Sequence, residues 1–161
     1  MIKINLKKII LCSLLATFIF ALDRFSKLYI LNLAEINNFV DIYLTSFFNL
    51  YLIWNKGIAF GILSFDQKII YNFITGLIIF ITLIIFIITI KSQNYKIYFY
   101  VLILSGSLGN IFDRVYYQAV PDFIDFHIND FHWFVFNVAD IFITLGIICL
   151  IFAEIFFNKK V

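Results

Sequence analysis

Long apolar runs, separated by two stretches of mixed character, dominate the hydrophobic pattern of this chain. A helix that crosses the hydrocarbon core of a membrane needs about 20 predominantly apolar residues in succession. The segments that meet this need are residues 9–31, 69–90, 97–114 and 138–157. The third contains SGSLGN, and small residues are common where membrane helices pack closely. The pattern therefore predicts an all-α membrane protein, with four transmembrane helices in a single integral-membrane domain over residues 1–161.

The two connecting segments, residues 32–68 and 115–137, have a different character. Within the first, FFNLYLIWN has the composition of a short strand, and NKGIAFG is typical of a turn that contains glycine. The second is rich in Phe, Tyr and Trp, and Trp and Tyr favour the headgroup zone of a bilayer. We therefore expect a small β-containing cradle and an aromatic loop at the membrane surface.

Composition agrees with a membrane protein. The chain is 63% hydrophobic and 14% charged, whereas soluble domains are roughly half apolar and a quarter charged. The net charge of +2, without a basic stripe interleaved with aromatic residues, argues against nucleic acid as a partner. Cys12 and Cys149 lie in apolar runs, where a free cysteine behaves as a small hydrophobic residue.

The distribution of charge predicts the orientation in the membrane. Cytoplasmic segments carry an excess of Lys and Arg. Basic residues gather near both ends of the chain and between the second and third spans, at Lys3, Lys7, Lys8, Lys91, Lys96, Lys159 and Lys160. Of the ten acidic residues, only Glu154 falls on that side. We expect both termini to be cytoplasmic, the connecting segments to face outward, and the first span to be retained, because no small-x-small cleavage site follows it.

Two aspartates are candidates for chemistry at the outer boundary of the membrane. Asp140 begins the fourth span, and Asp122, in the preceding connection, can fold back to the same depth. Two carboxylates in a low-dielectric site cannot both ionise easily. Such a pair suits peptide hydrolysis, in which the ionised member activates water and the protonated member polarises the scissile carbonyl. The alternative is that Asp140 caps the fourth helix and Asp122 is an ordinary loop acid.

Other polar residues interrupt the first and third spans. Asp23 and Lys27 are one helical turn apart and can pair; such a pair marks either a functional site or an ion pair that locks helices together. Asn110 offers an amide that can satisfy a neighbouring carboxylate. Asp113 and Arg114 can pair locally or hold another segment, and Asp113 is a third candidate for the catalytic role.

Two further features lie in the connecting segments. The turn with Asn55 and Gly57 offers backbone groups and small residues that allow a substrate to approach closely. His127 and His132 occur in the aromatic segment, but with no cysteine nearby a metal site is disfavoured there.

Taken together, these motifs resemble those of the bacterial lipoprotein signal peptidases (signal peptidase II), over nearly the whole chain. In chain order they are Asp-x-x-x-Lys (23–27), Asn-x-Gly-x-Ala-Phe (55–60), Gly-Asn-x-x-Asp-Arg (109–114), Val-x-Asp-Phe (120–123) and Phe-Asn-x-Ala-Asp (136–140). The resemblance implies a multi-pass aspartyl endopeptidase of the bacterial cytoplasmic (inner) membrane. It would cut prolipoproteins just before a diacylglyceryl-modified cysteine, with its active site toward the outer face.

The resemblance also implies residue roles. It places the catalytic aspartates at Asp122 and Asp140. Positions that line or support the site fall on Asp23, Lys27, Asn55, Gly57, Asn110, Asp113, Arg114, Asn137 and Ala139. No metal or organic cofactor is implied, and the expected partners are lipid-modified prolipoproteins, membrane lipids and inhibitors of the globomycin type.

The chain departs from the family pattern at two positions. Pro121 stands where the family usually has Val, which removes a backbone donor and stiffens the approach to Asp122. Ile58 stands where the family has Ala, so lipid contacts of the turn are expected to differ.

Two other classes of protein remain as alternatives. They are a small ion or proton carrier, which would need polar residues through every span, and a non-catalytic membrane assembly subunit.

Overall fold

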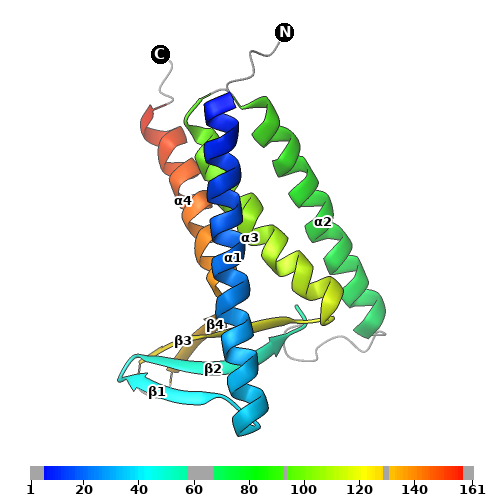
Figure 1. Ribbon diagram of the computed structural model, residues 1–161, viewed down its shortest axis with the longest axis vertical. Helices are drawn as coiled ribbons and strands as arrows, with labels where there is room; N and C mark the ends of the chain where they lie inside the picture. The colour runs from blue at the N-terminus through cyan, green and yellow to red at the C-terminus, as the bar shows by residue number, and fades with distance from the viewer. Residues whose placement is uncertain (1–5, 58–66, 93, 129–130, 158–161) are drawn as a thin grey trace.

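A helical bundle with a small sheet across one end makes up the computed structural model, which describes residues 6–57, 67–92, 94–128 and 131–157 (Figure 1). Its helices are α1 (Leu6–Asn37), α2 (Gln67–Lys91), α3 (Lys96–Tyr116) and α4 (Val138–Phe157). The beginning of α1 and the end of α4 both lie at the end of the bundle away from the sheet (Figure 1). A helix is present at each of the four predicted segments, with α2, α3 and α4 within two residues of the predicted bounds and α1 longer than predicted.

Among the described residues, α1, α2 and α4 are the helices long and apolar enough to cross a membrane. The third predicted span, α3, forms a helix but buries several polar and charged side chains, including Lys96, Asp113 and Arg114. It packs against α1, α2 and α4. Charged groups inside a membrane protein face the bundle interior, so a helix in this central place can be more polar than its neighbours.

Glycines on α3 allow this close packing. A Cβ atom at Gly106 would lie 2.5 Å from the carbonyl oxygen of Ala139, at the start of α4. A Cβ at Gly109 would lie 2.6 Å from Oδ2 of Asp23 on α1. The small residues of the SGSLGN segment thus bring three helices together, as the sequence predicts for residues of this kind.

Helix α1 continues to Asn37 rather than ending near residue 31. The reason is a small apolar core between this extension and the sheet. Ile30 packs with Val40 and Phe123, and Leu33 and Ala34 lie against the same cluster. Burial of this face stabilises the additional helical turns.

The sheet is antiparallel, with strand order β1 (Asp41–Thr45), β2 (Phe48–Asn55), β3 (Val120–Ile128) and β4 (Phe131–Phe136). The strand predicted from FFNLYLIWN is β2. The expectation of an aromatic loop over residues 115–137 is wrong, because most of that segment forms β3 and β4.

Cross-strand packing explains why the aromatic segment is extended. Aromatic residues fit a pleated, half-buried surface, and Phe126 on β3 lies 5.3 Å from the ring of Phe48 on β2 and 5.8 Å from that of Phe136 on β4, measured between ring centroids. The register pairs Asn55 with Val120 and Ile53 with Asp122. Asp122 therefore lies on an inner strand rather than in a loop.

Candidate active site

Asp122 is a buried carboxylate whose two oxygens are each held by an amide. The Asn137 side chain donates to Oδ1 at 2.5 Å, and the Asn55 side chain donates to Oδ2 at 2.8 Å. Asn55 is within reach because β2 and β3 are paired there. Asp122 is 3% exposed, so its orientation is fixed from both sides away from bulk water.

Asp140 lies in the first turn of α4 and takes part in a capping box with Asn137. Its backbone N–H donates to Oδ1 of Asn137 at 3.2 Å, while its Oδ2 accepts from the backbone N–H of Asn137 at 3.1 Å. This reciprocal pair satisfies two N–H groups at the helix start. The remaining oxygen, Oδ1, accepts from the Asn110 amide at 2.8 Å. Asp140 therefore has the capping geometry of the simpler alternative and also faces a polar neighbour from α3.

Asp122 and Asp140 line the same cavity, which has a volume of about 260 Å³. Its other lining residues are Asn55, Ile78, Ser107, Asn110, Arg114, Val120, Asn137 and Ile143. Because a water occupies roughly 30 Å³ in the liquid, the cavity can hold several waters or part of a peptide. Both carboxylates can therefore act on the same bound group.

Burial, reinforced by the charge of Asp140, raises the pKa of the Asp122 carboxyl to about 6, although the amides of Asn137 and Asn55 oppose the shift. A carboxyl with a raised pKa beside a second carboxyl keeps a proton at a pH where an ordinary aspartate has lost it. One proton shared by two carboxylates is the arrangement used in acid–base peptide hydrolysis.

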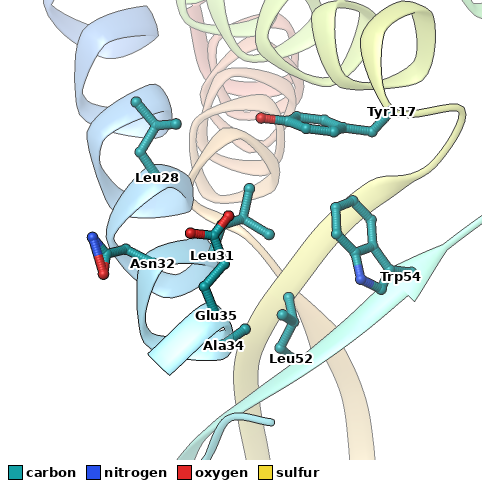
Figure 2. Close-up of a pocket in the computed structure, with 8 residues that line it drawn as sticks. All are labelled: Leu28, Leu31, Asn32, Ala34, Glu35, Leu52, Trp54 and Tyr117. Atoms are coloured by element: carbon teal, nitrogen blue, oxygen red, sulfur yellow. The ribbon is translucent and has the colours of Figure 1, made fainter. Parts of the chain in front are cut away.

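A larger pocket of about 600 Å³ lies between the last turns of α1, strand β2 and the residue that follows α3 (Figure 2). Figure 2 shows Trp54 and Tyr117 across the pocket from Leu28 and Leu31 of α1. Glu35 is the one acid among its described lining residues. The smaller cavity, rather than the larger pocket, therefore has the paired groups that acid–base chemistry needs.

A buried ion cluster of two acids and two bases lies between α1 and α3. Lys27 Nζ is 2.8 Å from Asp23 Oδ1 and 2.7 Å from Asp113 Oδ2. Arg24 donates to Asp113 Oδ1 at 2.6 Å and to Asp23 Oδ2 at 2.9 Å. Asp23, Lys27 and Asp113 are each at most 1% exposed, so their charges balance one another inside the bundle.

Two hydrogen bonds connect this ion cluster to the carboxylate cavity. Asn110 accepts from Lys27 Nζ at 2.9 Å through its Oδ1 and donates to Asp140 through its Nδ2. The backbone N–H of Ala139 donates to Asp23 Oδ1 at 3.1 Å. The ion cluster therefore fixes both the amide that orients Asp140 and the first turn of the helix that carries it.

Arg114 and Gly57 meet at another edge of the cavity. Gly57 has a positive φ of 74°, and a Cβ there would lie 2.9 Å from Nη2 of Arg114. Its backbone N–H donates to Oδ1 of Asn55 at 2.7 Å. Arg114 also lies over the ring of Tyr71, 5.5 Å from its centroid. Among the described residues the buried Nη1 of Arg114 has no hydrogen-bond partner, which leaves a donor for a bound group.

The structure thus brings most of the predicted site residues together. Those that line the cavity are Asn55, Asn110, Arg114, Asp122, Asn137 and Asp140. Asp23, Lys27 and Asp113 belong to the ion cluster, and Gly57 and Ala139 reach the site through Arg114 and Asp23. The later part of the turn motif, including Ile58, lies outside the described residues.

Of the two possibilities for Asp113 and Arg114, contact with another segment is confirmed, because Asp113 pairs with α1 and Arg114 faces Gly57. Arg24, which completes the ion cluster, was missed as a site residue. Its signal in the sequence was a third charge beside Asp23 and Lys27 within one span.

The fold defines a multi-pass membrane protein, and paired carboxylates in one cavity fit the chemistry of an aspartic peptidase. A family model described as Signal peptidase (SPase) II matches residues 15–156. The chain belongs to the signal peptidase II family. This membership confirms the resemblance seen in the sequence. It also supports the predicted enzyme class, an aspartic endopeptidase, and the predicted function, removal of lipoprotein signal peptides.

Curated lipoprotein signal peptidases are similar to this chain over most of its length. A lipoprotein signal peptidase of Pelagibacter ubique (strain HTCC1062) is 56% identical over 158 residues, which are 98% of this chain and 95% of the relative. One from Francisella tularensis subsp. novicida (strain U112) is 40% identical over 151 residues, 91% of this chain and 92% of that protein.

Solved structures show the same fold. Two structures described as a bacterial membrane enzyme, at 2.3 Å and 1.9 Å resolution, match with TM-scores of 0.68 and 0.69. They are 26% and 27% identical to this chain, and each match covers 93% of it and 92% or 94% of the other chain. This chain therefore shares its fold with structures of bacterial membrane enzymes, in agreement with the family.

Proposed function

We propose that Asp122 and Asp140 are the catalytic pair of this peptidase. It would remove the signal peptide of lipid-modified prolipoproteins by cutting just before the diacylglyceryl-modified cysteine. The observation that carries the proposal is that both carboxylates line one cavity and are joined by Asn137. Metal ions and organic cofactors have no part in the proposed reaction.

The proposed reaction uses one proton held by the pair. The ionised carboxylate accepts a proton from a water molecule as the water oxygen attacks the scissile carbonyl carbon. The protonated carboxyl gives its proton to the carbonyl oxygen, so that a neutral tetrahedral intermediate forms. Transfer of a proton to the leaving nitrogen then breaks the C–N bond, and the carboxyl and amino products separate.

Neighbouring side chains would hold the pair ready for these transfers. Both Asp122 oxygens and both Asp140 oxygens accept hydrogen bonds from Asn55, Asn110 or Asn137. Fixed donors of this kind reduce the reorganisation needed during reaction. The ion cluster, through Asn110, provides a rigid base for this arrangement.

The substrate would bind in the outer part of the bundle. Nη1 of Arg114, which has no partner among the described residues, suits a carbonyl oxygen of an extended peptide. Ile78 and Ile143 supply apolar surface on the cavity wall. Asp140 lies in the first turn of an apolar helix and would therefore lie at the boundary of the hydrocarbon core. A lipid-modified cysteine would meet water at the same depth. Inhibitors of the globomycin type would compete for this cavity.

We further propose the location of the whole chain. Residues 1–161 would form one integral-membrane domain with four spans in the bacterial inner membrane, in contact with its lipids. Both termini would be cytoplasmic and the sheet and cavity would face outward. The positions of basic residues and the location of the helix ends opposite the sheet (Figure 1) support this orientation.

The test is cleavage of a diacylglyceryl-modified prolipoprotein by the purified chain in detergent–lipid micelles, followed by the mobility shift on a gel. Asp122→Asn and Asp140→Asn should each remain folded and lose cleavage. Asp41→Asn, an exposed acid on β1 of the same sheet, is the matched control and should cleave like wild type. Normal cleavage by either catalytic variant would overturn the assignment of the pair.

A further inference from the structure

A second group of titratable side chains lies on the sheet, away from the carboxylate cavity. Asp125 and His127 are on β3, and His132 is on β4 directly opposite His127. Nδ1 of His132 is 2.8 Å from Asp125 Oδ2, and Nδ1 of His127 is 3.7 Å from the same oxygen. The two imidazole rings are 5.2 Å apart between centroids. Three side-chain atoms of the kind that bind metal ions therefore lie close together, and they come from two strands.

Two polar atoms of this group are buried and have no hydrogen-bond partner among the described residues. Asp125 is 1% exposed and His127 is 9% exposed. Within the part of the chain that the structure describes, Asp125 Oδ1 and His127 Nδ1 have no hydrogen-bond partner. An unsatisfied buried polar atom costs free energy, and a carboxylate costs more than a neutral group. A cation bound between these side chains would give His127 Nδ1 a partner and would balance the charge of the Asp125 carboxylate.

We propose that Asp125, His127 and His132 bind a divalent transition-metal ion of the zinc type. Two imidazoles and one carboxylate are a donor set that Zn²⁺ uses, with a water in the fourth position. The sequence alone disfavours a metal because no cysteine lies near the two histidines. The fold adds a carboxylate, that of Asp125, to the two histidines.

The geometry fits a tetrahedral ion after small shifts. Ligand distances of about 2.0–2.2 Å place tetrahedral ligand atoms roughly 3.3–3.6 Å apart. The separations from Asp125 Oδ2, 2.8 Å and 3.7 Å, lie on either side of that value, and the three ligand atoms all lie within 4.8 Å of one another. The His132 side chain is 55% exposed, which gives an ion and its water access from solvent.

The site would join β4 to β3, the strand that also carries Asp122. It takes no part in the proposed peptide hydrolysis, so its test is independent of the peptidase assignment. A bound ion would stabilise the folded protein in proportion to the logarithm of its concentration above the dissociation constant.

The experiment is equilibrium dialysis of the full chain in detergent, freed of any polyhistidine tag and of metal by a chelator, against Zn²⁺ or Mg²⁺. Thermal unfolding is measured in the same samples. Wild type should bind one Zn²⁺ per chain, with a rise in Tm, and should not respond to Mg²⁺, which prefers oxygen ligands.

His127→Ala and His132→Ala should each weaken Zn²⁺ binding by at least about tenfold and abolish the rise in Tm. Asp41→Asn, the control acid on the same sheet, should bind like wild type. His132→Ala also removes the hydrogen bond to the buried Asp125, so its Tm in chelator should fall. Dialysis below that Tm, where the variant is still folded, separates loss of binding from loss of folding. Failure of wild type to bind Zn²⁺, or binding that is unchanged in both histidine variants, overturns the proposal.

Discussion

Asn137 and Asp140 cap each other at the start of α4, and the same Asn137 side chain donates to Asp122 at 2.5 Å. One residue thus begins a helix and orients both carboxylates of the cavity. These two roles can be separated, because the cap needs a side-chain oxygen acceptor whereas the bond to Asp122 needs a side-chain donor of the right length.

Asn137→Ala should lose both roles. Loss of an N-cap costs about 0.5–2 kcal/mol, and cleavage should fall by about a hundredfold or more as the pair loses its orientation. Asn137→Ser keeps the oxygen that caps α4 but is too short to replace the amide at Asp122. It should therefore lose less stability than Asn137→Ala and still cleave poorly. Full activity in Asn137→Ser would show that Asp122 needs no amide from this position.

The buried ion cluster should be essential to stability. Lys27→Met leaves Asp23 and Asp113 with one cation between them, and removal of one partner from a buried ion pair costs about 3–5 kcal/mol. We expect a large fall in the temperature of thermal unfolding in detergent. Glu154→Gln, in the pair between Glu154 and Lys96, is the control. Glu154 is 64% exposed, so the change should have little effect. Equal effects of the two substitutions would contradict the buried role of Lys27.

Stability should depend on pH through Asp122. Its folded pKa of about 6 exceeds the ordinary value of 3.8, so the folded state binds this proton more tightly than the unfolded state. The resulting stabilisation is fully present below about pH 3.8 and is lost as the pH rises through about 6. In Asp122→Asn this contribution disappears. The difference in unfolding free energy between wild type and variant should therefore change between pH 4 and 6, as measured by denaturant unfolding. A constant difference across this range would refute the raised pKa.

Gly57→Ala should disturb the cavity through Arg114. A non-glycine residue at a φ of 74° is strained by about 1–2 kcal/mol, and the added Cβ would displace the guanidinium that lies 2.9 Å away. Cleavage should fall by about tenfold or more, since a misplaced binding group weakens catalysis. Gly76→Ala on α2 is the matched control, because a Cβ there meets nothing within 4 Å. Unchanged cleavage in Gly57→Ala would mean that Arg114 adapts freely.

Much of this architecture follows from the sequence for simple physical reasons. Apolar runs near 20 residues leave few alternatives to helices, and the strand of residues 47–55 is marked by its aromatic and β-branched composition. Asp122 and Asp140 could be proposed as a pair because a span boundary fixes the depth of one of them. Each of these inferences uses local pattern or membrane depth.

The inferences that failed depend on contacts between distant segments. Strands β3 and β4 are stabilised by pairing with β2 and with each other, which the aromatic composition alone did not reveal. Arg24 matters because Asp113 arrives from α3. The group of Asp125 with two histidines exists only in the strand register. Sequence spacing says little about any of these juxtapositions.

The ion cluster has a consequence for the biogenesis of the protein. Helix α1 holds one acid and two bases at Asp23, Arg24 and Lys27, and the neutralising Asp113 belongs to α3. While the ribosome is still synthesising α2, the first helix carries an uncompensated positive charge, and a lone charge among lipid tails is costly. We therefore expect stable insertion of α1 to depend on α3, whose Asp113 neutralises this charge.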